Sequence, residues 1–273
     1  MSTRIGRSSF RVRFDECGPD GLLRTSVLLR YAQDLASYHS ALVGIDRAWY
    51  AERGIGWLVR AAEVAVLRPL GVGDELQGAT KAVGFRRVWA RRRSEFRDAA
   101  GELVVWCNID WVLLDARGRP TRIPPAFDEA FGAPPAAFDL ARVAIGPAPP
   151  EAHRATFTVR PQELDPMDHA NNAVYADWLD EAIVRAGAEA AVRAIPRFAR
   201  LEYARSAERD DRVTVEAWPD GDGSGWSVRI IDDAGDLLRA RLEPTDGSAG
   251  PPPPVMAPDV PALSPMDTRG RLA

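Results

Sequence analysis

The chain carries one sequence pattern twice, at a constant distance of 147 residues. The first copy begins FRVRFDECGPDGLLRTSVLLRYAQDLA at Phe10, and the second begins FTVRPQELDPMDHANNAVYADWLDEAI at Phe157 (157 − 10 = 147). Aligned without a gap, the copies share Phe10/Phe157, Val12/Val159, Arg13/Arg160, Glu16/Glu163, Pro19/Pro166 and Val27/Val174. Such a repeat predicts two structural units built to one plan that pack against each other.

The two copies differ at a small set of polar positions. The second copy has Asp165, His169 and Asn172 where the first has Gly18, Leu22 and Thr25. Chemistry depends on particular side chains rather than on the fold that carries them. The asymmetry therefore predicts that the second unit performs the chemistry, while the first supports the fold or holds a substrate.

Each copy continues with the same order of elements. Apolar residues at helical spacing predict a helix over 22–43, with Thr25 and Ser26 as N-cap candidates and Gly44 as its end, and a further helical turn over 46–53. Runs rich in β-branched and aromatic residues, separated by Gly and Pro, predict strands over 57–70, 74–85, 88–99 and 102–116. The second copy predicts a helix from about Asn172 to Ala194 and strands over 199–208, 211–219, 225–233 and 236–244.

A long helix wrapped by an antiparallel sheet, present twice, predicts an α+β chain with a tandem hot-dog arrangement. We expect the two sheets to join edge to edge, because this pairing removes two exposed edges. The expected divisions are an N-terminal unit at 1–131, a Pro- and Ala-rich linker at 132–153, a C-terminal unit at 154–246 and a disordered Pro-rich tail at 247–273.

Composition excludes several classes of function. The formal net charge of −4 argues against a dedicated binder of nucleic acid or of a membrane surface. Neither Cys17 nor Cys107 lies in a metal-binding or disulfide pattern, and the chain has no glycine-rich phosphate loop, so no metal and no cofactor is expected. The N-terminal stretch has no apolar segment typical of a signal peptide, and no apolar run is long enough to span a membrane. The expected location is the cytoplasm.

The candidate site is the segment from Asp165 to Asn172, directly before the second predicted helix. A turn can direct Asp165 and His169 at one point in front of the helix N-terminus, near Asn171 and Asn172, where unpaired N–H groups would polarise a carbonyl oxygen. Asp165 could be a nucleophile or the base that activates water, and His169 could orient that water or exchange a proton with a leaving thiol. The alternative is that these are ordinary turn and capping residues, which is the preferred interpretation for Asp168, Asn171 and Asn172.

Other polar residues are assigned structural roles. His39 is expected to pack on the first helix, Cys17 to be a small buried residue, and His153 to be exposed in the linker. Tyr31, Trp57, Trp111 and Trp178 are expected in the core or in the lining of a pocket. The basic cluster of Arg86, Arg87, Arg91, Arg92 and Arg93 predicts a solvated face, with an acidic carrier protein or a CoA phosphate as the less favoured interpretation.

The segment DPMDHANNAVYADWLDEA (165–182) resembles the D-x-N-x-H-x-N-N-x-x-Y-x-x-W segment of the acyl-ACP thioesterases of plants and bacteria. The first copy resembles the same family in E-x-G-x-D at 16–20, in the L-Q-x-T-A-x-x-H region at 31–39 and in the glycine at Gly44. Trp57 to Arg60, Gly73-Asp74 and Ile123-Pro124 fall where that family has W-V-L-x-R, G-D and K-I-P. The resemblance extends from about residue 10 to residue 245.

This resemblance implies hydrolysis of a fatty acyl thioester on a tandem hot-dog fold, with water as the second substrate. It implies that the second unit is catalytic, with Asp165 and His169 as the essential residues, and that the first unit supplies the acyl-chain pocket. Three positions depart from the family: Met167 replaces its Asn, and Ser206 and Ala207 replace its Glu and Cys. Met167 and Ser206 are therefore only possible auxiliaries.

The expected function is hydrolysis of acyl-ACP or acyl-CoA to a free fatty acid and a thiol. The runner-up is a noncatalytic acyl-thioester or acyl-carrier binding protein, and the third hypothesis is a hot-dog hydratase or dehydratase. The expected partner is an acyl carrier protein or a CoA thioester, with no nucleic acid, no membrane and a possible homodimer. The sequence does not predict the acyl chain length.

Overall fold

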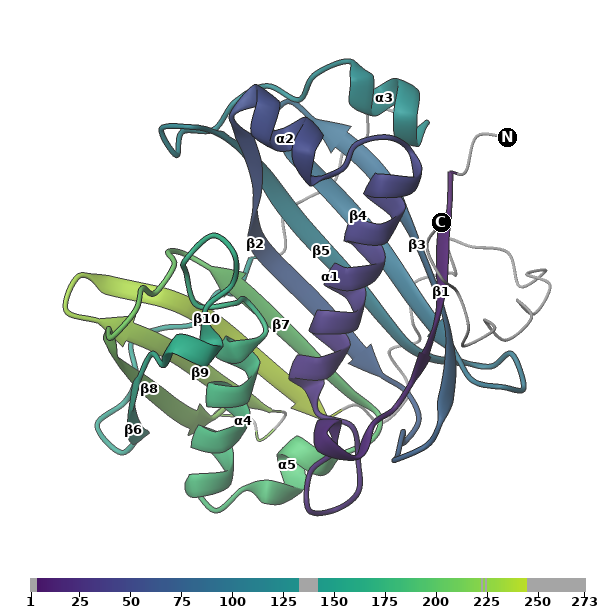
Figure 1. Ribbon diagram of the computed structural model, residues 1–273. Coiled ribbons are helices and arrows are strands. Elements are labelled where there is room, and N and C mark those ends of the chain that lie inside the picture. Colours follow the sequence, from purple (N-terminus) through teal and green to yellow (C-terminus); the bar gives the residue numbers. More distant parts are fainter. Residues whose placement is uncertain (1–3, 133–141, 222, 224, 245–273) are drawn as a thin grey trace.

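The computed structural model describes residues 4–132, 142–221, 223 and 225–244, and their strands form one sheet (Figure 1). The ten strands are ordered β1-β3-β4-β5-β2-β7-β10-β9-β8-β6, and every pair is antiparallel. The first unit contains β1 (Gly6–Arg11), η1 (Phe14–Glu16), α1 (Thr25–Leu42), α2 (Arg47–Arg53), β2 (Ile55–Val66), β3 (Glu75–Arg86), β4 (Trp89–Arg97), β5 (Leu103–Asp115) and α3 (Ala126–Phe131). The second contains β6 (His153–Thr158), η2 (Pro161–Glu163), α4 (Val174–Arg185), α5 (Glu189–Arg193), β7 (Arg197–Tyr203), β8 (Arg212–Pro219), β9 (Trp226–Asp232) and β10 (Gly235–Pro244).

The sheets of the two units join through β2 and β7. Ala61 to Val66 of β2 pair in antiparallel register with Glu202 to Arg197 of β7. Figure 1 shows α1 lying across the first half of the sheet and α4 across the second half, on the same face. The predicted tandem hot-dog fold, with its sheets joined edge to edge, is confirmed.

The repeat of the sequence is a repeat of the backbone. The short helix η1 carries a capping box between Arg13 and Glu16, and η2 carries the same box between Arg160 and Glu163, 147 residues later. The guanidinium of Arg30 on α1 pairs with Asp177 on α4 at 3.0 Å, and these positions also differ by 147. Equivalent points of the two helices therefore meet, so the units are related by an approximate twofold axis between α1 and α4.

Two helix assignments differ from the sequence predictions. The N-cap of α1 is Arg24 and not Thr25 or Ser26; the hydroxyl of Thr25 instead accepts a hydrogen bond from Arg197 at 3.2 Å. The predicted helix over 172–194 is two helices, because α4 ends at Arg185 and the chain adopts a left-handed conformation at Gly187, with φ of +84°, before α5. A Ser or Thr near the start of a helix acts as a cap only where its side chain reaches an unpaired backbone N–H group of the first turn. The residue types alone do not show where this is so.

Apolar residues form two clusters. The larger one is continuous across both units and includes Leu35 of α1, Leu179 of α4 and Leu201 of β7, each at most 2% exposed. The smaller cluster lies in the first unit away from the junction: Ile45, Phe85, Ala90, Phe127 and Phe131 are buried in it, and Trp49, Tyr50, Trp57 and Trp111 are among those packed against it. Of the four aromatic residues assigned from sequence to core or pocket, Tyr31 and Trp178 lie in the larger cluster and Trp57 and Trp111 reach both the smaller cluster and a cavity described below.

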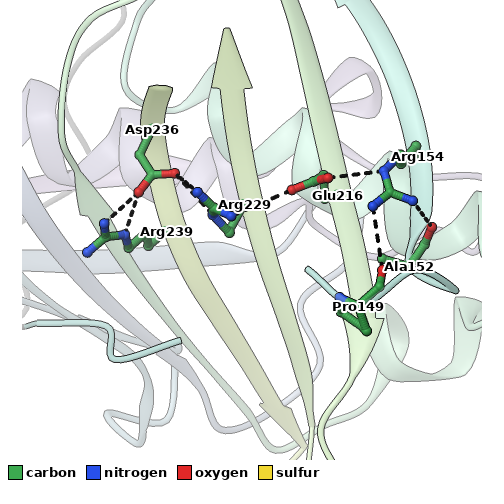
Figure 2. Close-up of polar contacts among 7 residues, drawn as sticks. All are labelled: Pro149, Ala152, Arg154, Glu216, Arg229, Asp236 and Arg239. Carbon is green, nitrogen blue, oxygen red and sulfur yellow. Dashed lines mark hydrogen bonds and ion pairs between the residues drawn. The ribbon is translucent and has the colours of Figure 1, made fainter. Parts of the chain in front are cut away.

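A chain of alternating charges crosses the strands of the second unit (Figure 2). Asp236 accepts hydrogen bonds from Arg239 and Arg229, Arg229 pairs with Glu216 at 3.9 Å, and Glu216 accepts a bond from Arg154 at 3.0 Å. Arg154 also donates to the carbonyl oxygens of Pro149 and Ala152, which fastens the segment before β6 to the sheet. His153 belongs to β6, and its Nε2 is buried, so the prediction of an exposed linker histidine is wrong.

The arginine cluster of the first unit does not form a solvated face. Arg91 makes two hydrogen bonds to Asp110, at 2.6 and 2.7 Å, and Arg92 lies 2.8 Å from Nδ1 of His39. Arg93 is 1% exposed, with its guanidinium over the ring of Trp106. Only Arg86 and Arg87 of the cluster, which precede β4, are exposed. The side chains of the other three lie on β4, where successive residues point to opposite faces of the sheet.

No helix in the described part of the chain is both long enough and apolar enough to cross a membrane. The predicted tail over 247–273 and most of the predicted linker, 133–141, lie outside the described residues.

We predict that Asp180 of α4 makes the free energy of unfolding depend on pH. Burial raises the pKa of this carboxyl from 3.8 to about 7, against the opposing effect of Arg197. The native state therefore holds a proton that the unfolded state has released between about pH 4 and pH 7, so this group lowers stability as pH rises, by at most about 1.4 kcal/mol per pH unit. We expect Asp180→Asn to match the wild type in free energy of unfolding near pH 4 and to exceed it at pH 8, measured by denaturant titration at each pH.

Asp177→Asn is the matched control on the same helix. Its carboxylate forms a half-exposed pair with Arg30, whose loss costs about 0–1 kcal/mol. A difference between Asp180→Asn and the wild type that stays constant from pH 4 to pH 8 would contradict the prediction.

Candidate active site at the junction of the two units

A cavity lies where β2 separates from β7. The β2–β7 pairing stops at Ala61, and Arg60, directly before it, is a β-bulge between β2 and β5. A bulge bends its strand and redirects a side chain. The Arg60 guanidinium accordingly reaches across the gap and donates to the carbonyl oxygen of Ala204, just past the end of β7, at 2.6 Å.

The cavity has a volume of about 80 Å³. Its lining combines the start of β2 with the turn before α4 and the chain after β7: Gln33, Trp57, Leu58, Val59, Arg60, Trp111, Asp165, Met167, His169, Ala170, Asn172, Tyr175, Tyr203, Arg205 and Ser206. Both units therefore contribute to one site, as neither could do alone.

The turn from Asp165 to His169 is closed by backbone hydrogen bonds. The N–H of Asp165 donates to the carbonyl oxygen of His169 at 2.9 Å, and that of Asp168 donates to the carbonyl oxygen of Asp165 at 2.9 Å. Oδ1 of Asp165 accepts the N–H of Met167 at 2.8 Å, which fixes the carboxylate in the turn. Both Asp165 and His169 line the cavity, so the structure brings the two predicted catalytic residues together.

The same turn exists in the first unit. The N–H of Gly18 donates to Leu22, and that of Gly21 to Gly18, at 2.8 and 2.9 Å. Gly21, with φ of +75°, is the counterpart of Asp168, whose φ of +62° lies in the same left-handed region. The turn therefore belongs to the repeated fold, and only its side chains differ between the units.

The asparagines before α4 have different roles. The N-cap of α4 is Ala173, and no side chain caps this helix, so the prediction that the asparagines are caps is wrong. Oδ1 of Asn171 accepts the N–H of Ala173 at 3.0 Å, in the turn before the helix. Asn171 does not line the cavity, so it is not brought to the site. Asn172 does line it, and its carbonyl oxygen is held by the hydroxyl of Tyr203 at 2.8 Å.

Two buried hydrogen-bond donors of the cavity lack a partner among the described residues: Nδ2 of Asn172 and the indole Nε1 of Trp111. Buried polar groups are almost always hydrogen-bonded, and an unsatisfied one in a folded protein requires an explanation such as a bound water or a substrate atom. Both groups can only donate, so they require an acceptor, such as a carbonyl oxygen or a water.

Several ionisable side chains around the cavity are buried, and burial shifts their pKa values toward the uncharged form. Burial raises the pKa of Tyr175 to about 12 and raises that of Tyr203 as well, and burial lowers the pKa of the Arg60 guanidinium. The hydroxyl of Tyr175 accepts the N–H of Ala207 at 2.7 Å, which positions the segment carrying Ser206. Electrostatic interactions inside such a site are stronger than in water.

The remaining predicted residues are placed as follows. Met167 and Ser206 line the cavity, and Asp168 is exposed, with an ion pair to Arg209 at 3.1 Å, in agreement with a turn role. His39 is fully buried and Cys17 is 6% exposed, so both structural predictions are confirmed. Within the described residues, no three His, Cys, Asp or Glu side chains gather as a metal site would require.

Sequence reasoning missed eight residues of the lining, among them the polar residues Gln33, Arg60, Tyr175 and Tyr203. The signal for Gln33, Arg60 and Tyr175 was present, because each lies inside a motif quoted above for its resemblance. Tyr203 had no such signal, since only the β2–β7 junction brings the end of β7 to the turn.

A tandem hot-dog chain with an Asp and a His in a cavity at the junction of its units defines a narrow class. The model of the acyl-ACP thioesterase N-terminal domain matches residues 4–131, and that of the C-terminal domain matches residues 148–236. The chain belongs to the acyl-ACP thioesterase family.

Individual relatives are more distant. The chloroplastic dodecanoyl-acyl-carrier-protein hydrolase of Cinnamomum camphora is 27% identical over 66% of this chain and 51% of its own length. The chloroplastic acyl-acyl-carrier-protein hydrolase FATB2 of Cuphea viscosissima is 23% identical over 90% of this chain and 64% of its own. The chain thus spans between half and two thirds of these curated relatives. The solved 12:0-ACP thioesterase of Umbellularia californica superposes with a TM-score of 0.73, at 24% identity, over 88% of this chain and 96% of that one, and so shows the same fold.

Variants of Asp168 test whether its left-handed backbone conformation or its carboxylate stabilises the turn. We expect Asp168→Gly to retain stability within about 1 kcal/mol, because glycine adopts positive φ without penalty and already stands at the equivalent Gly21. Asp168→Val should lose about 1–3 kcal/mol, since a β-branched residue is strained there. Thermal unfolding of the two variants measures the difference; equal losses would show that the carboxylate and not the backbone conformation stabilises the turn.

Proposed function

We propose that the chain hydrolyses fatty acyl thioesters to a free fatty acid and a thiol. The observation that supports this most directly is the placement of Asp165 and His169 in one cavity, whose lining includes Asn172 and Trp111. A base, a second proton-transfer group and donors for a carbonyl oxygen are the parts that acyl transfer to water requires.

In the proposed reaction, Asp165 takes a proton from a water molecule as its oxygen attacks the thioester carbon. The carbonyl oxygen becomes negatively charged, and the N–H groups of Asn172 and Trp111 stabilise that charge. The C–S bond then breaks, the oxygen reforms its double bond to carbon, and the thiolate receives a proton from His169. Direct attack by the carboxylate, with a mixed anhydride hydrolysed in a second step, uses the same residues and remains the alternative role of Asp165.

The thiol that we propose is an acyl carrier protein, with CoA as the alternative. The family is defined by acyl-ACP thioesterases, and both curated relatives carry acyl-carrier-protein hydrolase names. No cofactor takes part in the proposed reaction, because water is the second substrate. A cytoplasmic location and a homodimer stay predictions.

The noncatalytic alternative would be supported by an Asp165 carboxylate locked in an ion pair. Within the described residues Asp165 forms no ion pair, and its one hydrogen bond leaves an oxygen available for water. Met167, which replaces the family Asn, is 51% exposed, and its methyl group lies at the start of β2 beside Gly56. The site is therefore neither neutralised nor filled, which favours hydrolysis over mere binding.

Asp165→Asn and Asp165→Ala should each lower kcat by about 10²–10⁴-fold, the usual contribution of a general base. Thiol release from acyl-CoA and acyl-ACP, over C4 to C18, measures the loss, while circular dichroism confirms folding. Asp168→Asn is the matched control, three residues away in the same turn and exposed, and should retain activity within about threefold. Turnover that survives Asp165→Ala unchanged would remove Asp165 from the mechanism.

A further inference from the structure

We infer that Arg60 is a positioning residue for the proposed reaction, because its side chain fixes the segment 204–207 of the second unit from the first. This segment sets the place of His169 and Ser206 in the cavity. The role of Arg60 rests on the proposed function, since it concerns the same site. It gives the first unit a part in the chemistry, which the sequence pattern predicts for the second unit alone.

A β-bulge places Arg60 at the open side of the junction. In the pairing of β2 with β5, Val59 lies opposite Trp111, and Ala61 lies opposite Asp110, the next residue back along β5, so Arg60 is the extra residue between them. The pairing of β2 with β7 also begins only at Ala61. A bulge bends its strand and redirects a side chain, and bulges occur often beside active sites. Arg60 is thus free of the sheet where the cavity begins.

The Arg60 guanidinium binds the main chain of the other unit. It donates to the carbonyl oxygen of Ala204 at 2.6 Å, and it is partly buried. Among the hydrogen bonds between described residues, this is the only one that joins the first unit to the segment 204–207. Arg60 forms no ion pair with a described residue. A bond from a charged donor is stronger than one between neutral groups, and low local polarity strengthens it further.

The segment 204–207 in turn holds the end of the turn that carries His169. The carbonyl oxygen of Ala207 accepts the N–H of Ala170 at 2.8 Å, and Ala170 directly follows His169. Ser206 lies within the segment, and both Ser206 and His169 line the cavity. A shift of the segment would therefore move both side chains relative to β2, which contributes the opposite wall.

The other anchors of the segment belong to the second unit. The N–H of Ala204 donates to the carbonyl oxygen of Leu237 at 2.8 Å, and the hydroxyl of Tyr175 accepts the N–H of Ala207 at 2.7 Å. These bonds stay in place when the Arg60 side chain is removed. Its loss should consequently leave the second unit folded and change how the segment is held across the cavity.

The first test compares Arg60→Met with Arg60→Lys in the full chain. Met is about as long as the stem of Arg60 but cannot donate, whereas Lys keeps a charged donor that can reach one carbonyl oxygen. We expect Arg60→Met to lower kcat about 10- to 100-fold, because a misplacement of about 1 Å costs about 10²-fold, and to change KM less than about threefold. Arg60→Lys should recover most of the loss.

Arg30→Met is the matched control. Arg30 also crosses between the units, with a 3.0 Å bond to Asp177, but it does not line the cavity, so its removal should leave kcat within about twofold. Thiol release from the acyl thioester that the wild type hydrolyses fastest measures all three variants, and circular dichroism confirms folding. An unchanged kcat in Arg60→Met, a loss confined to KM, or an equal loss in Arg60→Lys would each overturn the positioning role.

The ring signals of His169 in NMR spectra test the same role without turnover. The chain has three histidines, and His39 and His153 do not line the cavity. Arg60→Met should shift the His169 signals and leave the other two in place, and Arg30→Met should leave all three in place. This pattern would support the positioning role even if the wild type hydrolyses no thioester. Unshifted His169 signals in Arg60→Met would overturn it, whether or not the proposed hydrolysis is observed.

Discussion

The pairing of β2 with β7, and its end at the Arg60 bulge, is the constraint on which the rest of the site depends. From Ala61 onward this pairing joins two half-sheets into one and buries a continuous core. Before it, β2 has no partner in β7, so the strand and the second unit enclose a cavity instead of a sheet. An uninterrupted pairing of β2 with β7 would extend the sheet and place paired strands where the cavity lies in front of the Asp165 turn. The bulge thus converts a structural junction into a site.

Much of the fold and of the candidate site could be predicted from the sequence, because the repeat in the sequence is also a repeat in the backbone. The 147-residue offset reproduces the η1 and η2 capping boxes, the two turns and the contact between α1 and α4. The Asp165 and His169 prediction needed only this local geometry. The wrong predictions concern residues whose roles depend on tertiary neighbours. Thr25, predicted as a cap, binds Arg197. The arginines of β4, predicted as a solvated face, bind Asp110 and His39 or pack on Trp106. Charge and cap preferences along a sequence do not show which residues of a distant strand will face them.

The approximate twofold axis implies a second position equivalent to the site, and this position carries different side chains. There, Gly18 and Leu22 replace Asp165 and His169, and Asp20, the counterpart of Met167, forms an ion pair with Arg193 at 3.1 Å. Thr25, the counterpart of Asn172, accepts the hydrogen bond of Arg197, which is 5% exposed. At the equivalent position, the polar side chains of Asp20 and Thr25 are therefore paired with arginines of the second unit.

This difference has an energetic logic. Unpaired buried donors and a non-glycine residue at positive φ each cost stability, of the order of about 1–3 kcal/mol. A symmetric pair of such turns would incur that cost twice, whereas in this chain only one of the two equivalent turns has a non-glycine residue at positive φ. Asp168 with φ of +62° beside Gly21 with φ of +75° illustrates the division at a single position.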